Sequence, residues 1–317
     1  MHIRIADLFC GIGGIAEAVH RLPDSTHEDA TASVGELRTS HPKVVTAIDI
    51  DRSVASLYQH HHGIVPRCST IESLQRVAEG SDEELDMWWM SPPCQPYTIR
   101  GSQRGALDSR SHALARLIQL IPRERPRLIG LENVPAFEGS QHHQQLKQTL
   151  SDAGYQFNEY TLCPTDLGIP MRRQRFYLLA KQEGKPFPTI STGKRQRPLA
   201  EFINDACWED NSLKVPPEAV RHYESAMNII EPGNRDAITA CFTSAYGKSP
   251  IRSGSYLHSS THNSVRRFSP NEIATLMGFR DDFFSTANLS QRSQYRLIGN
   301  SLAVPVVYEL LSVLIAE

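Results

Sequence analysis

The sequence predicts an α/β protein: a doubly wound, Rossmann-like parallel sheet with a second, smaller domain. The first observation is an apolar run at 3–9 that passes through a glycine turn into a helical pattern at 15–19. The second is a series of later apolar runs, at 43–48, 85–90 and 127–131, separated by helical patterns. The third is the length of 317 residues, enough to bury a large core and form one large and one small domain.

Composition and charge exclude several classes of protein. The chain is 40% hydrophobic and 21% charged with a net charge of −2, which argues against a generally basic nucleic-acid coat, so nucleic-acid binding needs a local patch. Its six cysteines form no CxxC pair, so we expect neither a zinc site nor a disulfide framework, and reduced thiols favour a cytoplasmic protein. The chain opens directly on a strand pattern, and the apolar run at 302–316 is too short and polar to span a membrane, so we expect no signal peptide and no membrane partner.

The turn after the first strand contains Gly11, Gly13 and Gly14. Glycines there let the backbone turn tightly and let a cofactor approach. Their Gly-x-Gly-Gly spacing differs from Gly-x-Gly-x-x-Gly, so a dinucleotide phosphate is not the natural ligand. The alternative is a tight strand-to-helix turn that holds no ligand.

The second strand is expected at 43–48, after an extended polar loop at 23–42, and it ends at Asp49. An acidic residue there can accept hydrogen bonds from ribose hydroxyls, whereas Asp51 fits the cap of the next helix. Residues 70–72 lie where an adenine ring would be held, or they are a simple helix start. The histidines at 60–62 are not expected to bind metal, because adjacent histidines point around a helix and cannot converge.

The run at 85–90 is expected to be a buried strand, and Pro92 and Pro93 stop it directly before Cys94. A thiol there sits at the carboxyl edge of the sheet, where open α/β folds place their ligands. We interpret Cys94 as a nucleophile aimed at a nucleobase. The basic, glycine-containing loop that follows, with Arg100 and Arg104, is typical of loops that cover a substrate, although a solvated surface loop is the alternative.

Two further segments supply charged side chains. A helix at 114–121, stopped by Pro122, precedes a strand at 127–131 that runs into Glu132, whose partial desolvation would raise its pKa and let it act as an acid. Alternatively Glu132 is a helix-capping acid. A strand from Met171 onward would place Arg173 and Arg175 on one face, suited to a phosphate or a base carbonyl, unless it is a solvated edge strand.

The stretch at 184–267 is rich in proline and weakly periodic, so it is predicted to be the second, smaller domain, while 1–183 and 268–317 form the large domain. Within it, a thiol, two aromatic rings and a glycine at 241–247 could contact a stacked or extruded nucleotide. The alternative is a strand and turn in a small core. A helix capped by Ser269 and a last helix with an apolar stripe complete the chain.

Several of these pieces match one family, in order. The chain resembles the C5-cytosine methyltransferases, which use S-adenosylmethionine on a class I methyltransferase sheet. The matching segments are 7–14, 92–98, 132–134, 173–175, 267–272 and 299–301. The segment at 241–247 and the short second domain resemble the branch that methylates cytosine 38 in the anticodon loop of tRNA-Asp. Two departures are Met171, where the family has a glutamine or asparagine, and the length of the 23–42 loop.

The resemblance implies that 184–267 is a target-recognition domain and that 1–183 and 268–317 form the S-adenosylmethionine-binding catalytic domain. It also implies a role for each matching residue. Cys94 would attack C6 of the cytosine, Glu132 would hold N3 and the exocyclic amine, and Arg173 would bind O2. Arg175 would steady the cysteine loop or a phosphate. Asp49 would bind the ribose of S-adenosylmethionine. The other implied cofactor residues are Phe9, Gly11, Ile12, Gly13, Gly14, Ile50, Ile71, Glu72, Pro93, Asn300 and Ser301. The implied substrate residues are Gln95, Arg100, Arg104, Cys241, Phe242, Thr243 and Tyr246.

The expected partner is the anticodon stem-loop of a tRNA, and no metal is expected. A DNA (cytosine-5)-methyltransferase is the nearest alternative, because the chemistry would be identical and only the polymer differs. A catalytically silent nucleic-acid-binding module is disfavoured because Cys94, Glu132 and Arg173 occur together. A nicotinamide-dependent oxidoreductase is more distant, given the glycine spacing. The base that removes the C5 proton is not identified by any motif.

Overall fold

The structure is a computed structural model that describes residues 2–23, 40–79, 84–94 and 111–316. The chain divides into two compact units. The first comprises 1–162, 175–190 and 307–317, and the second comprises 163–174 and 191–306. Most of the segment predicted as the recognition domain, 191–267, falls in the second unit, together with 163–174 and 268–306. Its role in recognition stays a prediction.

The first unit is built on a seven-stranded sheet in the order β3-β2-β1-β4-β5-β7-β6. Strands β1 to β5 pair in parallel, and β7 runs antiparallel to both β5 and β6. The strands are β1 His2–Leu8, β2 Ser40–Asp49, β3 Arg67–Cys68, β4 Met87–Met90, β5 Leu128–Asn133, β6 Gln156–Leu162 and β7 Arg175–Lys181. The predicted α/β class with a doubly wound sheet is confirmed.

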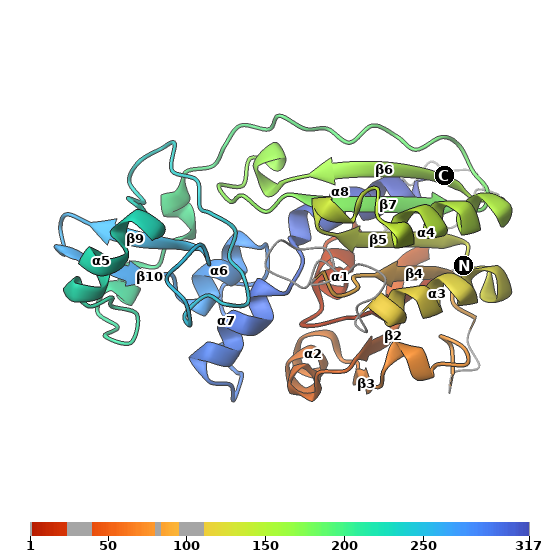
Figure 1. Ribbon diagram of the computed structural model, residues 1–317, viewed down its shortest axis with the longest axis horizontal. Coiled ribbons are helices and arrows are strands. Elements are labelled where there is room, and N and C mark those ends of the chain that lie inside the picture. The colour runs from red at the N-terminus through yellow and green to blue at the C-terminus, as the bar shows by residue number, and fades with distance from the viewer. Residues whose placement is uncertain (1, 24–39, 80–83, 95–110, 317) are drawn as a thin grey trace, which may run out of the picture. The chain divides into compact units, whose positions relative to one another are not determined.

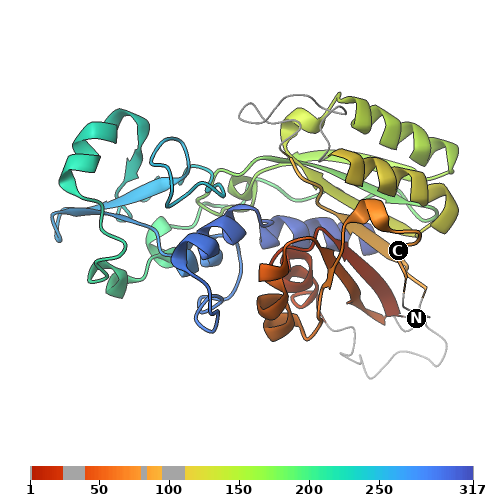
Figure 2. The same cartoon turned by 60° about the horizontal axis from the view of Figure 1, so that its bottom comes forward.

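Helices cover both faces of this sheet. Helices α3 and α4 lie on one face and α8 on the other (Figure 1 and Figure 2). The helices are α1 Gly14–Val19, α2 Ala55–His62, α3 His112–Glu124, α4 Gln141–Asp152 and α8 Val304–Ile315. Alternate residues of the strands, such as Trp88 and Met90 in β4, pack with α3 and α4 in one buried apolar cluster. The intervening residues, including Trp89, are buried on the opposite face of the sheet.

Several predicted boundaries differ from the structure. Strand β2 begins at Ser40, within the stretch predicted as a loop at 23–42. Helix α3 continues through Pro122, which falls in its last turn, and ends where Arg125 adopts a left-handed conformation. Strand β5 extends to Asn133, because its last residues pair with β7. The strand predicted from Met171 begins only at Arg175, since Met171 forms an isolated bridge with Thr239 instead.

The second unit contains short elements around a three-stranded sheet in the order β10-β9-β8. These strands are β8 Asn228–Ile230, β9 Ser255–Ser259 and β10 Ser264–Arg267, and the helices are α5 Pro217–Tyr223, α6 Pro270–Leu276 and α7 Gln291–Gly299. Ser269 caps α6 as predicted: its side chain accepts from the backbone N–H of Glu272, and the Glu272 carboxylate accepts from the backbone N–H of Ser269.

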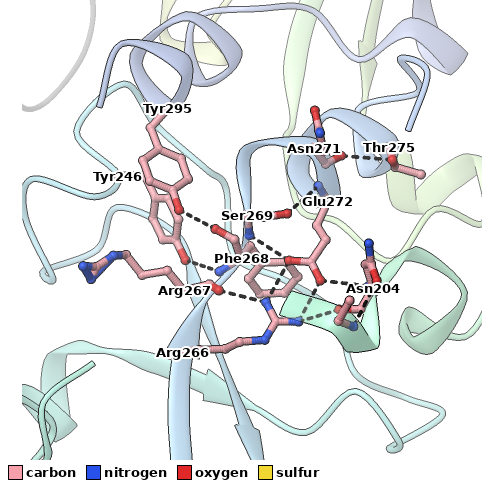
Figure 3. A network of polar contacts seen from close by, with 11 residues as sticks. Asn204, Tyr246, Arg266, Arg267, Phe268, Ser269, Asn271, Glu272, Thr275 and Tyr295 are labelled. Atoms are coloured by element: carbon pink, nitrogen blue, oxygen red, sulfur yellow. Dashed lines mark hydrogen bonds and ion pairs between the residues drawn. The ribbon is translucent and has the colours of Figure 1, made fainter. Parts of the chain in front are cut away.

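A buried ion pair holds this unit together (Figure 3). Arg266 is fully buried and donates two hydrogen bonds to the Glu272 carboxylate, at 2.7 and 2.8 Å. The same carboxylate accepts backbone N–H groups from Ser269 and Asn204. Beside it, the hydroxyl of Tyr295 donates to the backbone carbonyl of Phe268 at 2.6 Å. This network of charged and backbone hydrogen bonds fixes the start of α6 against β10.

The stretch Gln291–Ile315 is long and apolar enough to cross a membrane by length and composition alone. However, 67% of its most apolar window is buried inside the protein, as is usual for the core helices of soluble proteins. The structure also divides it into α7 and α8. The stretch is therefore weak support for a membrane span.

Candidate active site

The strand register brings the predicted chemical residues of the first unit to one edge of its sheet. Leu8 pairs with both Ile48 and Met90, and Met90 pairs with Leu131. The residues directly after these positions therefore share the carboxyl edge, where open parallel sheets bind ligands. They are Phe9, Asp49, Ser91 and Glu132.

The segment that carries Cys94 is tied to this edge by specific bonds. The backbone N–H of Ser91 donates to the carbonyl of Leu8 at 3.2 Å, and the Trp89 indole N–H donates to the Ser91 hydroxyl at 3.1 Å. The side-chain amide of Asn133 donates to the carbonyl of Pro92 at 3.4 Å. The turn before Cys94 is therefore attached to the strand end that bears Glu132. Cys94 itself is half-buried.

Glu132 is paired with Arg175. Nε of Arg175 lies 3.1 Å from Oε1 of Glu132, and both side chains are largely buried. The antiparallel register explains the contact: Glu132 pairs directly with Tyr177, so Arg175, two residues earlier in β7, lies diagonally across on the same face. The guanidinium compensates the charge of the Glu132 carboxylate, whose side chain is only 11% exposed.

Arg173 has a different environment from the one predicted. It precedes β7, so the prediction that Arg173 and Arg175 share one face of a strand is wrong. Its guanidinium is buried within the second unit, where it donates to the backbone carbonyls of Phe242, Gly299 and Ser301. Arg173 thus cross-links the segments at 241–243 and 299–301. This structural role accounts for an arginine at this position, and no contact with a base is needed to explain it.

The predicted ribose ligand, Asp49, is held in place by the backbone. Its two carboxylate oxygens accept the N–H groups of Gly11 and Asp51, each at 2.8 Å. The backbone N–H of Ile50 also bonds this carboxylate, which still has acceptor capacity for a further donor. Burial raises the pKa of Asp49, while these backbone bonds oppose the shift. The next residue, Ile50, is 68% exposed, which is unusual for a large apolar side chain and suits contact with a flat ring.

The remaining predicted cofactor residues of the first unit differ in access. Phe9 follows β1 with a φ of 63°, a strained conformation for a bulky residue, and such outliers concentrate at functional sites. Ile12, Gly14 and Ile71 are buried, whereas Glu72 is exposed and Pro93 half-buried. Gly13 has a φ of 88°, and a Cβ there would lie 2.3 Å from Nε2 of His62, so a packing contact explains this glycine.

Sequence reasoning gave no separate role to Asp7, although the residue stands within a quoted motif. Asp7 is buried, and Tyr58 donates a hydrogen bond to its carboxylate at 2.9 Å. Burial raises the pKa of Asp7 to about 7, and the neighbouring Asp49 adds to this effect. A carboxyl residue inside an otherwise apolar strand was the signal that could have identified it. Asn133 was missed in the same way, within the motif that supplied Glu132.

The predicted substrate residues of the second unit are largely inaccessible. Phe242 and Tyr246 are each only 1% exposed, and their rings pack edge-to-face at 5.0 Å. The prediction that these two rings contact a nucleotide is therefore wrong. They belong to a small core, as the alternative interpretation of this segment has it. Cys241 and Thr243 are half-buried.

Asn300 and Ser301 follow α7 in the same unit. The preceding residue, Gly299, packs closely on Thr243. A Cβ added to Gly299 would lie 2.3 Å from the carbonyl carbon of Thr243, so only glycine fits there. Their predicted contact with the cofactor stays a prediction. Gln95, Arg100 and Arg104 lie outside the described residues.

Comparisons with known proteins agree with this arrangement. The model of the family described as C-5 cytosine-specific DNA methylase matches residues 3–316. A human tRNA (cytosine(38)-C(5))-methyltransferase is 27% identical, covering 98% of this chain and 99% of that protein. The crystal structure of the S. pombe Dnmt2 methyltransferase superposes with a TM-score of 0.81 at 27% identity, covering 98% of each chain. A DNA (cytosine-5)-methyltransferase of Dictyostelium discoideum is 26% identical over 99% of this chain and 94% of that protein.

Proposed function

This chain belongs to the C-5 cytosine-specific DNA methylase family, and we therefore propose that it methylates C5 of a cytosine in transfer RNA with S-adenosylmethionine as donor. The target we propose is cytosine 38 in the anticodon loop of tRNA-Asp. Relatives named as tRNA (cytosine(38)-C(5))-methyltransferases support the position, and the resemblance of the segment at 241–247 supports tRNA-Asp. The expected setting is the cytoplasm.

The observation that carries the proposal is the pairing of Glu132 with Arg175 beside the Cys94 turn. A nucleophile, a carboxylate and a guanidinium come from three neighbouring strand ends, and the Asn133 bond to Pro92 joins two of them. These are the three groups that C5 methylation requires at one ring: a sulfur for C6, a partner for N3 and the amine, and a donor for O2.

The chemistry assigned to these residues follows from the reactivity of cytosine, whose C5 is a poor nucleophile. The Cys94 thiolate forms a bond to C6, which saturates the 5,6 bond and makes C5 an enamine carbon. Glu132 stabilises the protonated N3 and accepts from the exocyclic amine, and Arg175 donates to O2 as negative charge develops there. Once C5 carries the methyl group, loss of the C5 proton to a base breaks the C6–S bond and frees Cys94.

S-adenosylmethionine, when bound, supplies an electrophilic methyl group on a sulfonium centre. The residues present fit this donor. Asp49 retains acceptor capacity for a ribose hydroxyl, and Ile50 presents an exposed apolar side chain for the adenine. The strained Phe9 and the glycine turn follow the neighbouring strand β1 at the same edge of the sheet. The roles of Pro93, Glu72, Asn300 and Ser301 stay predictions.

An RNA loop is favoured as substrate because the target base must leave its stack before Cys94 can reach C6. The bases of an anticodon loop are already unpaired, so the energy needed for extrusion is smaller than in a duplex. The net charge of −2 also requires that binding use a local basic surface.

The proposal is tested by methyl transfer from tritiated S-adenosylmethionine to purified tRNA and, in parallel, to unmethylated DNA. We expect incorporation into tRNA that disappears when cytosine 38 of the tRNA is replaced by uridine. The second candidate, a DNA methyltransferase, rests on the Dictyostelium relative. It would be favoured by incorporation into DNA with none into tRNA, and Cys94→Ala would be the inactive control for both substrates.

A further inference from the structure

A cluster of metal-ligating side chains lies in the first unit, outside the strand edge that carries the proposed reaction. Glu17 lies within α1, His20 directly follows its last residue, and His62 is the last residue of α2. One ligand atom from each of the three lies within 4.8 Å of the others. We propose that Glu17, His20 and His62 bind a divalent transition-metal ion, with Zn²⁺ as the first candidate.

The spacing of the first two ligands supports the proposal. Glu17 and His20 stand three residues apart, so they project from the same side of the helix, as in the Glu-x-x-His pairs of metal-binding bundles. His62 approaches from the neighbouring helix, and its ring centroid lies 5.3 Å from that of His20. Adjacent histidines on one helix cannot converge, but histidines from two helices can.

The orientation of His62 also suits a ligand. Its Nε2 lies 3.4 Å from the carbonyl oxygen of Ile12. A ring that donates from Nε2 carries its lone pair on Nδ1, and this kind of backbone bond fixes the tautomer and direction of metal-binding histidines. The ring is further positioned by the edge-to-face contact with Tyr58, at 4.8 Å between centroids.

Charge and space at the cluster favour a small cation. The Glu17 side chain is 7% exposed and lies 3.5 Å from Arg21, so this buried carboxylate is stabilised by a neighbouring cation. Arg21 is 42% exposed and can turn outward when a metal replaces it. A pocket of about 220 Å³, lined in part by His20 and His62, adjoins the cluster and gives room for a water ligand.

The donor set determines the class of metal. Two imidazoles and one carboxylate with an open position match zinc sites and other borderline divalent ions better than Mg²⁺ or Ca²⁺, which prefer all-oxygen ligands. His41 lines the same pocket, but its two ring nitrogens lie within 3.2 Å of the carbonyls of Pro42 and Leu22, so we exclude it from the ligand set.

A bound ion would join the ends of α1 and α2. These two helices follow the glycine turn and Asp49, and His62 packs directly on Gly13. The ion would therefore stabilise the folded protein in proportion to its saturation, whether or not the proposed methyl transfer is correct.

The test is zinc binding by full-length protein that has been stripped with a chelator, measured by competition with a chromogenic zinc indicator. We expect one tight site per chain in the wild type and in His60→Ala, a control that removes an exposed histidine two residues from His62. His20→Ala also removes an exposed ring, so it leaves the core intact, and it should weaken binding by at least about 100-fold. Glu17→Gln should do the same.

Two further readouts separate this site from zinc held elsewhere. Zinc should raise the melting temperature of wild type and His60→Ala but not of His20→Ala. Bound Co²⁺ should lack a thiolate-to-metal charge-transfer band, because no cysteine is in the ligand set. The proposal is overturned if His20→Ala and Glu17→Gln bind zinc like the wild type, if His60→Ala weakens binding equally, or if the cobalt spectrum shows thiolate ligation.

Discussion

Replacing Arg175 by methionine tests the site geometry because it removes the guanidinium from Glu132 and keeps the apolar part of the side chain. The contact is 3.1 Å long, with side chains 16% and 11% exposed, so solvent screens it little. Loss of one donor to developing charge typically costs about 2.7–4 kcal/mol, which corresponds to about a 10²- to 10³-fold loss of kcat. We expect that loss of kcat together with a lower free energy of unfolding, because the buried Glu132 carboxylate loses its charged partner.

The matched control is Arg197→Met. Arg197 and Glu201 are closer, at 2.8 Å, but their side chains are 52% and 46% exposed. Exposed pairs contribute about 0.2–1 kcal/mol, so this variant should retain normal kcat and nearly normal stability.

Arg173→Met should fail in a different way. It leaves buried backbone carbonyls of Phe242, Gly299 and Ser301 without their charged donor. We expect at least about 3 kcal/mol lower free energy of unfolding, measured by urea denaturation.

The assay for all three variants is steady-state methyl transfer to tRNA alongside urea denaturation. The reasoning is refuted if Arg175→Met keeps wild-type kcat, or if Arg173→Met loses kcat without any loss of stability. The second result would return the O2 contact to Arg173.

Cys94→Ala should abolish methyl transfer while leaving the binding of labelled S-adenosylmethionine in equilibrium dialysis unchanged; normal turnover would disprove the nucleophile. Because the pKa of Asp7 is raised from 3.8 to about 7, the folded state retains a proton that the unfolded state loses. The free energy of unfolding should therefore fall as pH rises from about 4 to about 7, by up to about 4 kcal/mol. Asp7→Asn should remove this slope in urea titrations, and an unchanged slope would contradict the assignment. Arg266→Met should lower stability by about 3–5 kcal/mol, because it strands the buried Glu272 carboxylate, and adding Glu272→Leu should recover much of the loss. Failure of the double variant to recover would count against this explanation.

Much of the fold followed from local patterns. Apolar runs in the sequence predicted where the parallel strands lie. Asp49, Cys94 and Glu132 follow the ends of these runs, and parallel strands share one carboxyl edge, so the three could be assigned to one site. The helix cap at Ser269 could also be predicted from the sequence, because a capping box involves only residues close together in the chain.

The errors came from contacts between residues far apart in the chain. The alternation of Arg173 with Arg175 suggested a strand that does not form there. Arg173 is instead bonded to carbonyls that lie 126 and 128 residues further along the chain, which no local pattern predicts. Pro122 was expected to end a helix that in fact tolerates it in the last turn. The convergence of His62 with Glu17 and His20 depends on how α1 and α2 lie, which no periodicity within one helix predicts.

The most direct test of the central claim is a covalent trap. A tRNA anticodon stem-loop with 5-fluorocytosine at position 38 lacks the C5 proton whose loss frees the enzyme, so the C6–S bond should persist after methyl transfer. We predict a stable protein–RNA adduct that forms only with S-adenosylmethionine, and peptide mass spectrometry should place the nucleotide on Cys94. An adduct on any other cysteine, or no adduct while ordinary tRNA is methylated, would contradict the account.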